Sequence, residues 1–130
     1  TGSFGIECIS RGAEKVIFFE NYLHSIKILK KNLEILKLKK YSKIIEKDAY
    51  DISQFKFNFK SFDLIFLDPP FKYNKINELI KKIKIMKITT KESLIIIHRN
   101  KKITENISKD LSISKEKNYG LSKIIFGKIH

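Results

Sequence analysis

Short apolar runs and longer amphipathic segments alternate along this chain, and this alternation constrains its fold more than any other feature. Runs rich in isoleucine, phenylalanine and leucine have the length of buried strands and cover residues 15–20, 42–47, 62–67 and 93–98. Apolar residues recur every three or four positions, as on a helix with one buried face, over 22–39 and 74–87. This order predicts an α/β fold, in which a mostly parallel sheet carries helices on both faces.

The last third of the chain departs from this alternation. We expect a short helix over 103–111, followed by strands over 112–119 and 121–129 that form an antiparallel hairpin near Gly120. A length of 130 residues with 42% hydrophobic residues is enough for one compact core and too little for two. The sequence therefore predicts a single domain over 1–130.

Three of the predicted strands end at a carboxylate. Glu20, Asp48 and Asp68 each stand at or just beyond the end of an apolar run. Parallel sheets bind ligands beyond the carboxyl ends of their strands. If these strands are parallel and adjacent, the three acids line one edge of the sheet and belong to one site.

The first residues have the character of a ligand-binding loop that opens a helix. Thr1, Gly2, Ser3 and Gly5 fit the tail of a glycine-rich loop, although a simple turn is the commoner meaning of such a pattern taken alone. A loop of this kind normally follows a strand. We therefore expect a fragment whose first, central strand is missing, and which by itself folds poorly and lacks activity.

Two of the acids have a second interpretation each. Glu20 follows the glycines by about the spacing of a dinucleotide-binding fingerprint and can accept both hydroxyls of a ribose, but alone it also fits a solvated surface residue. Asp48, next to Ala49, can accept the amino group of an adenine. Taken alone, it is better explained as a cap for the segment behind it.

The segment Asp68-Pro69-Pro70-Phe71 is the strongest chemical signal in the sequence. The two prolines remove N–H donors and stiffen the backbone directly after a buried strand. The Asp68 carboxylate and the nearby carbonyls can accept hydrogens of an amino group, and the ring of Phe71 can stack on a base that carries this group. The alternative is a strand that ends in a proline turn.

Composition restricts the remaining possibilities. The formal net charge of +13 attracts phosphate, but all except two of the 27 basic residues are lysine, a bias that an A/T-rich genome also produces. We expect no membrane span and no signal peptide. Cys8 is the only cysteine, which favours a reducing, cytoplasmic setting. We expect no metal, and a structural role for His98, although it ends a strand and could face the site.

Taken together, these residues resemble the class I methyltransferases, and most of all the bacterial 16S ribosomal RNA guanine-N2 methyltransferases of the RsmD type. The resemblance covers nearly all of the chain. Its most specific parts are Gly5-Ile6-Glu7 followed by Ser10-Arg11-Gly12-Ala13, then the segment from Asp68 to Phe71, and the final hairpin at Tyr119-Gly120.

The resemblance implies a Rossmann-like sheet of seven strands with the last strand antiparallel, and S-adenosylmethionine as the methyl donor. By position, Gly2 and Gly5 would face its methionine part, Glu20 its ribose, and Asp48 with Ala49 its adenine. The segment from Asp68 to Phe71 would hold the amine that is methylated. The expected partner is ribosomal RNA or the small ribosomal subunit, and we expect a monomer.

Three other functions remain open on the sequence alone. The first is methylation of adenine N6 in DNA or RNA, which the Asp-Pro-Pro-Phe segment tolerates. The second is a catalytically inactive RNA-binding domain of the same fold. A dinucleotide-binding oxidoreductase would explain the glycines and Glu20 but gives the Asp-Pro-Pro-Phe segment no role.

Overall fold

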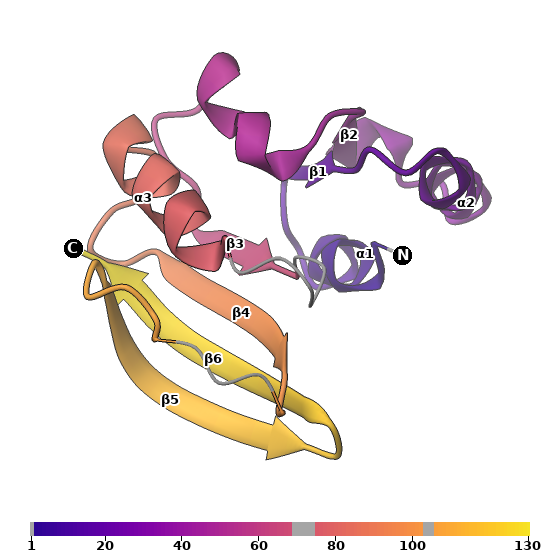
Figure 1. Ribbon diagram of the computed structural model, residues 1–130. Helices are drawn as coiled ribbons and strands as arrows, with labels where there is room; N and C mark the ends of the chain where they lie inside the picture. Colours follow the sequence, from indigo (N-terminus) through magenta and orange to yellow (C-terminus); the bar gives the residue numbers. More distant parts are fainter. Residues whose placement is uncertain (1, 69–74, 103–105) are drawn as a thin grey trace. The chain divides into compact units, whose positions relative to one another are not determined.

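The computed structural model describes residues 2–68, 75–102 and 106–130, which form two compact units. The first unit is Thr1–Asp51 and the second is Ile52–His130, and each is described by itself (Figure 1). Among the described residues, no helix combines the length and the apolar character needed to cross a membrane.

The first unit combines two helices with a pair of parallel strands. Its elements are α1 (Ser3–Ser10), β1 (Val16–Phe19), α2 (Leu23–Ile35), a 3₁₀ turn (Lys39–Tyr41) and β2 (Ser42–Ile45). In the parallel pair, Val16 lies opposite Ser42 and Phe19 lies opposite Ile45. A second 3₁₀ segment (Ala49–Gln54) follows β2.

The apolar stripe predicted for the long helix forms the core of this unit. Leu29 and Leu33 of α2 are buried together with Ile9 of α1, and Phe18 packs against them. The helix ends at Ile35, short of the predicted end, because Lys37 adopts a left-handed φ of 57° that a helix cannot continue through.

The second unit is a four-stranded sheet with one helix. Its elements are β3 (Leu64–Leu67), α3 (Ile76–Met86), β4 (Leu94–Asn100), β5 (Leu111–Tyr119) and β6 (Ser122–Ile129). The strand order is β3-β4-β6-β5. Strands β3 and β4 are parallel, whereas β6 is antiparallel to both of its neighbours, which confirms the antiparallel last strand. The predicted hairpin turns at Gly120, whose φ is 55°.

Strand β4 is buried on one face in its whole length. Ile95, Ile97 and Arg99 alternate along it and have 0% exposure, as expected for a central strand. Further buried side chains of the unit come from α3, β5 and β6, among them Ile76, Leu79, Ile80, Ile83, Leu111, Ile125 and Ile129. The helix stripe at three- and four-residue spacing therefore contributes to the core as predicted.

The short helix predicted over 103–111 is wrong for the residues that are described there. Residues 106–110 contain no helix, and β5 begins at Leu111. The side chain of Asn77 holds this segment beside α3. Its Nδ2 donates to the carbonyl of Asn106 at 2.7 Å, and its Oδ1 accepts the N–H of Ser108 at 2.7 Å. These tertiary hydrogen bonds replace the local ones of a helix.

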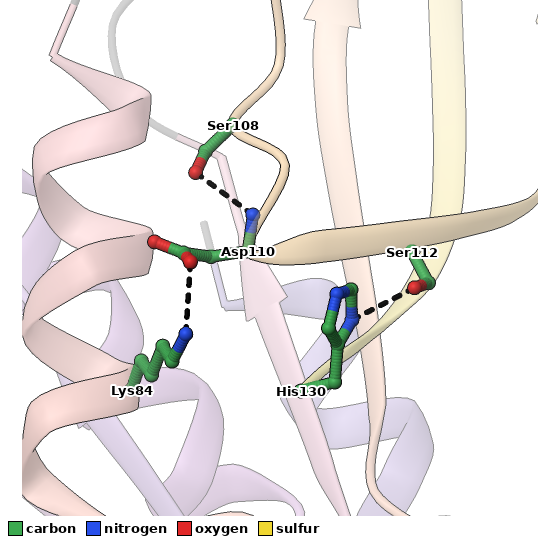
Figure 2. Close-up of polar contacts among 5 residues, drawn as sticks. All are labelled: Lys84, Ser108, Asp110, Ser112 and His130. Carbon is green, nitrogen blue, oxygen red and sulfur yellow. Dashed lines mark hydrogen bonds and ion pairs between the residues drawn. The ribbon is translucent and has the colours of Figure 1, made fainter.

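An ion pair joins α3 to the start of β5. Lys84 Nζ donates to Asp110 Oδ1 at 2.9 Å, and the Asp110 N–H donates to Ser108 Oγ at 3.1 Å (Figure 2). Close by, Ser112 Oγ and His130 Nδ1 are 2.8 Å apart across the ends of β5 and β6. The hydrogen bond from Lys84 holds the pKa of the Asp110 carboxyl below its ordinary value.

We expect Lys84→Met to destabilise the protein at neutral pH and not in acid. The folded state lowers the pKa of Asp110, so the ionised carboxylate adds stability that is complete at pH 7. This stability is lost as the pH falls below about 3.8, the ordinary pKa of an aspartate, and through the lower pKa of the folded state. At pH 7 the variant should lose no more than about 5 °C in Tm, because the pair is exposed.

Lys81→Met, on the same helix, is the matched control for this loss. Thermal unfolding of both variants and the wild type between pH 7 and pH 2 measures the difference. Equal Tm values for the two variants at pH 7, or a Lys84→Met loss that persists at pH 2, would contradict this account of Asp110.

Candidate active site

Glu20 is fixed at the carboxyl end of β1. Its N–H donates to the carbonyl of Ile45 at 3.1 Å, so the pairing with β2 extends one residue beyond the strand. Its carboxylate Oε1 accepts the N–H of Tyr22, the N-cap residue of α2, at 3.0 Å. The backbone of Glu20 is thus held by β2 and its half-buried carboxylate by the N–H of Tyr22, and the carboxylate retains further acceptor capacity for a ligand.

Asp48 lies just beyond β2, the parallel neighbour of β1. Its Oδ1 accepts the N–H of Tyr50 at 2.9 Å, which caps the 3₁₀ segment that begins at Ala49. The capping interpretation of Asp48 is therefore realised in the structure. Glu20 and Asp48 follow the carboxyl ends of two paired parallel strands, as predicted, and their roles toward a ligand stay predictions.

The glycines at the start of α1 allow close packing. Gly2, with a left-handed φ of 72°, has no room for a Cβ, which would lie 2.5 Å from Leu29 Cδ1. A Cβ on Gly5 would lie 2.7 Å from Phe18 Cζ and 3.0 Å from Val16 Cγ1. Both glycines let α1 approach its neighbours, and Ser3 begins the helix on an exposed position. Thr1 lies outside the described residues.

Asp68 follows β3 and is hydrogen-bonded to a histidine of the neighbouring strand. Asp68 Oδ1 lies 3.0 Å from His98 Nδ1, and His98 Nε2 lies 2.9 Å from Ser122 Oγ. The Asp68 side chain is 50% exposed and that of His98 is 24% exposed, so the carboxylate is the more accessible member of the pair. Pro69, Pro70 and Phe71 lie outside the described residues.

Sequence reasoning missed the connection from Asp68 through His98 to Ser122. It noticed that His98 ends a strand, but it favoured a structural role and gave Ser122 none. The signal that could have found it is the pairing register. In β3 and β4 the paired residues differ by 30, from Leu64 with Leu94 to Leu67 with Ile97, so the next pair is Asp68 with His98.

Other chemistries find little support among the described residues. No group of three or more histidine, cysteine, aspartate or glutamate side chains is placed there to hold a metal ion. Burial raises the pKa of the Cys8 thiol above its ordinary value, which favours the protonated form. The raised pKa makes Cys8 a poor nucleophile and suits a packing role.

We expect Gly5→Ala to destabilise the first unit, although alanine favours helix more than glycine does by about 1 kcal/mol. The added methyl would meet Phe18 and Val16, and overpacking of this kind costs about 1–3 kcal/mol. Chemical denaturation measures the change. Ser10→Ala, at an exposed position of the same helix, is the control and should change stability little. A stabilised Gly5→Ala protein would contradict the packing described for α1.

Similar proteins identify the family of the chain. The family described as Conserved hypothetical protein 95 matches residues 1–128. YlbH of Bacillus subtilis, provisionally named an rRNA methyltransferase, is 28% identical over an alignment that covers 95% of this chain and 68% of that protein. The Ribosomal RNA small subunit methyltransferase D of Haemophilus influenzae is 38% identical over 62% of this chain. That alignment covers 42% of the enzyme, which is less than half of its length.

Solved structures agree with the fold. A protein of Haemophilus influenzae that is provisionally named a methylase shares 29% identity over 99% of this chain and 81% of its own, with a TM-score of 0.81. A conserved protein of Streptococcus pyogenes has a TM-score of 0.86 at 25% identity, over 97% of this chain and 78% of its own. The Rossmann-like fold of class I methyltransferases is thereby confirmed. The chain belongs to the family Conserved hypothetical protein 95, and its resemblance to the RsmD-type methyltransferases is correct.

Proposed function

We propose that this protein transfers a methyl group from S-adenosylmethionine to the exocyclic N2 amine of a guanine in small-subunit ribosomal RNA. The observation that carries the proposal is the Asp68 carboxylate, fixed by His98 at the carboxyl end of β3 in a chain of this family. The domain over 1–130 would supply both the cofactor residues and the amine-binding residues. Ribosomal RNA as substrate would also agree with the predicted cytoplasmic setting.

The acceptor groups of the first unit fit the polar groups of S-adenosylmethionine. Glu20 offers a carboxylate to the ribose hydroxyls, and Asp48 with Ala49 offers an acceptor and an apolar surface to the adenine. The first turn of α1, which begins after Gly2 without a side-chain cap, has N–H groups that suit the carboxylate of the methionine part. When bound, the cofactor supplies a methyl group on a sulfonium centre.

Asp68 holds and polarises the amine. Its carboxylate accepts a hydrogen of the exocyclic amino group, which raises electron density on the nitrogen and aims its lone pair. The sequence adds the carbonyl of Pro69 as a second acceptor and the ring of Phe71 as a surface on which the base stacks. The proton that the amine loses passes to solvent after the new C–N bond has formed, so Asp68 does not need to be a strong base.

The choice of ribosomal RNA rests on two further facts. The relative of Haemophilus influenzae named Ribosomal RNA small subunit methyltransferase D is 38% identical over the aligned part, and YlbH has a related name. The net charge of +13 suits a substrate that carries one negative charge per nucleotide. Methylation of adenine N6 is the second candidate, because the Asp-Pro-Pro-Phe segment can hold that amine equally well.

We expect Asp68→Asn to reduce methyl transfer by about 10²-fold to 10³-fold, the loss usual when a group that stabilises developing charge is removed. Affinity for S-adenosylmethionine should not change, because Asp68 contacts the amine. The rate is measured as transfer of labelled methyl from S-adenosylmethionine to unmodified small-subunit RNA and particles. The affinity for S-adenosylmethionine is measured by calorimetry. Asp63→Asn, an exposed acid just before β3, is the matched control. Turnover that survives Asp68→Asn would refute this role.

We expect Glu20→Gln to weaken binding of S-adenosylmethionine by about tenfold to a hundredfold, the loss of hydrogen bonds to a charged acceptor. Calorimetric titration of the full-length protein gives the dissociation constant. Glu46→Gln changes an exposed acid of the same unit and should leave affinity as it is. Equal affinity of the Glu20→Gln variant and the wild type would remove Glu20 from the cofactor site.

A further inference from the structure

Three neighbouring strands bring Asp68, His98 and Ser122 to one edge of the sheet in the second unit. The register of β3 with β4 puts Asp68 next to His98. On the other side, β4 and β6 pair His98 with Ile124 and Asn100 with Ser122. Side chains two positions apart on a strand share a face, so Ser122 lies diagonally beside His98 and reaches its ring.

The hydrogen bonds fix which nitrogen of His98 carries a proton. An ionised carboxylate is an acceptor only, so the 3.0 Å contact with Asp68 Oδ1 requires a hydrogen on His98 Nδ1. In the neutral ring Nε2 then has a lone pair, and it accepts the hydroxyl hydrogen of Ser122 at 2.9 Å. Asp68, which can only accept, therefore selects the tautomer, and the Ser122 hydroxyl, which can donate or accept, fits it and holds the other side of the ring.

This arrangement restrains a carboxylate that would otherwise turn freely. The side chain of Asp68 is half exposed, whereas His98 comes from a central strand and is mostly covered. With Oδ1 engaged by the ring, Oδ2 is the oxygen available to a ligand in this pair. An acceptor in one fixed orientation is what alignment of an amine for attack requires.

We propose that His98 is a positioning residue for methyl transfer: its Nδ1–H orients the Asp68 carboxylate toward the amine, and the hydrogen bond between Ser122 and Nε2 holds the ring in place. The inference rests on the proposed function, because it assumes that Asp68 receives an amine. It assigns His98 no contact with the substrate. It predicts that the rate of transfer depends on a donor at the position of Nδ1 and little on the imidazole ring as such.

Two substitutions of His98 distinguish the contributions of its two ring nitrogens. Asparagine can place its amide Nδ2 near the position of Nδ1 and so keep a donor for Asp68. Glutamine reaches the position of Nε2 and loses that donor. We expect kcat to fall by roughly tenfold to a hundredfold in His98→Gln, the effect of one lost hydrogen bond to a charged group, and clearly less in His98→Asn. The KM for S-adenosylmethionine should not change in either.

The full-length protein is assayed for methyl transfer to small-subunit RNA, and Tm is measured for each variant. Equal kcat values for the Asn and Gln variants would overturn the inference, as would losses in rate that follow losses in Tm. If the wild type is active and Asp68→Asn is not, such a result removes the role of His98 and leaves the proposed function intact.

A measurement without turnover tests the pair separately. Nitrogen-15 NMR of the His98 ring reports which nitrogen is protonated, whether or not RNA is methylated. We expect a proton on Nδ1 in the wild type, because the partner of this nitrogen is the Asp68 carboxylate. A ring with Nδ1 unprotonated in the wild type would overturn the inference. A protonated Nδ1 in a protein that transfers no methyl group would instead support the hydrogen-bonded pair and contradict the proposed function.

Discussion

The pairing of β4 with β3 on one side and with β6 on the other is the constraint on which the proposed chemistry depends. A strand has two faces, and a shift of one residue would turn every side chain to the opposite face. In the observed register Ile95 and Ile97 are buried on one face, and His98 meets Asp68 at the end of β3. Burial of the isoleucines therefore also determines where the histidine lies.

Packing has a similar role in the first unit. Gly2 and Gly5 lie where a Cβ would collide with side chains of β1 and α2, so the start of α1 sits close to β1, the strand that Glu20 follows. The carboxylate of Glu20 in turn accepts the N–H of Tyr22, the residue that precedes α2. The residues that the sequence assigned to a cofactor thus also hold their own unit together. Substitutions there have to be tested for stability as well as for binding.

Much of the fold could be predicted from the sequence, because periodicity reports which side chains are buried. The strands, both long helices and the hairpin at Gly120 were found in this way. Element ends were less accurate, since they depend on single residues such as Lys37 with its positive φ. The helix over 103–111 was wrong where described because Asn77, about 30 positions earlier, provides the hydrogen bonds that hold this segment.

The candidate site was predictable only in part. Local patterns marked Glu20, Asp48 and Asp68, since a carboxylate after an apolar strand is visible in the sequence. No local pattern connects Asp68 with Ser122, because that connection needs the register of three strands that are distant in sequence. Propensity and periodicity do not carry register information between distant strands, so the hydrogen bonds of His98 with Asp68 and Ser122 could not be predicted.

The most direct test of the central claim is the identity of the methylated nucleoside. The full-length protein is incubated with labelled S-adenosylmethionine and small-subunit RNA or particles, and the RNA is digested to nucleosides and separated. The account predicts label in N2-methylguanosine. Label in N6-methyladenosine would contradict the assigned target and support the second candidate. No labelled nucleoside, from a protein that binds S-adenosylmethionine, would contradict the proposal that RNA is the substrate.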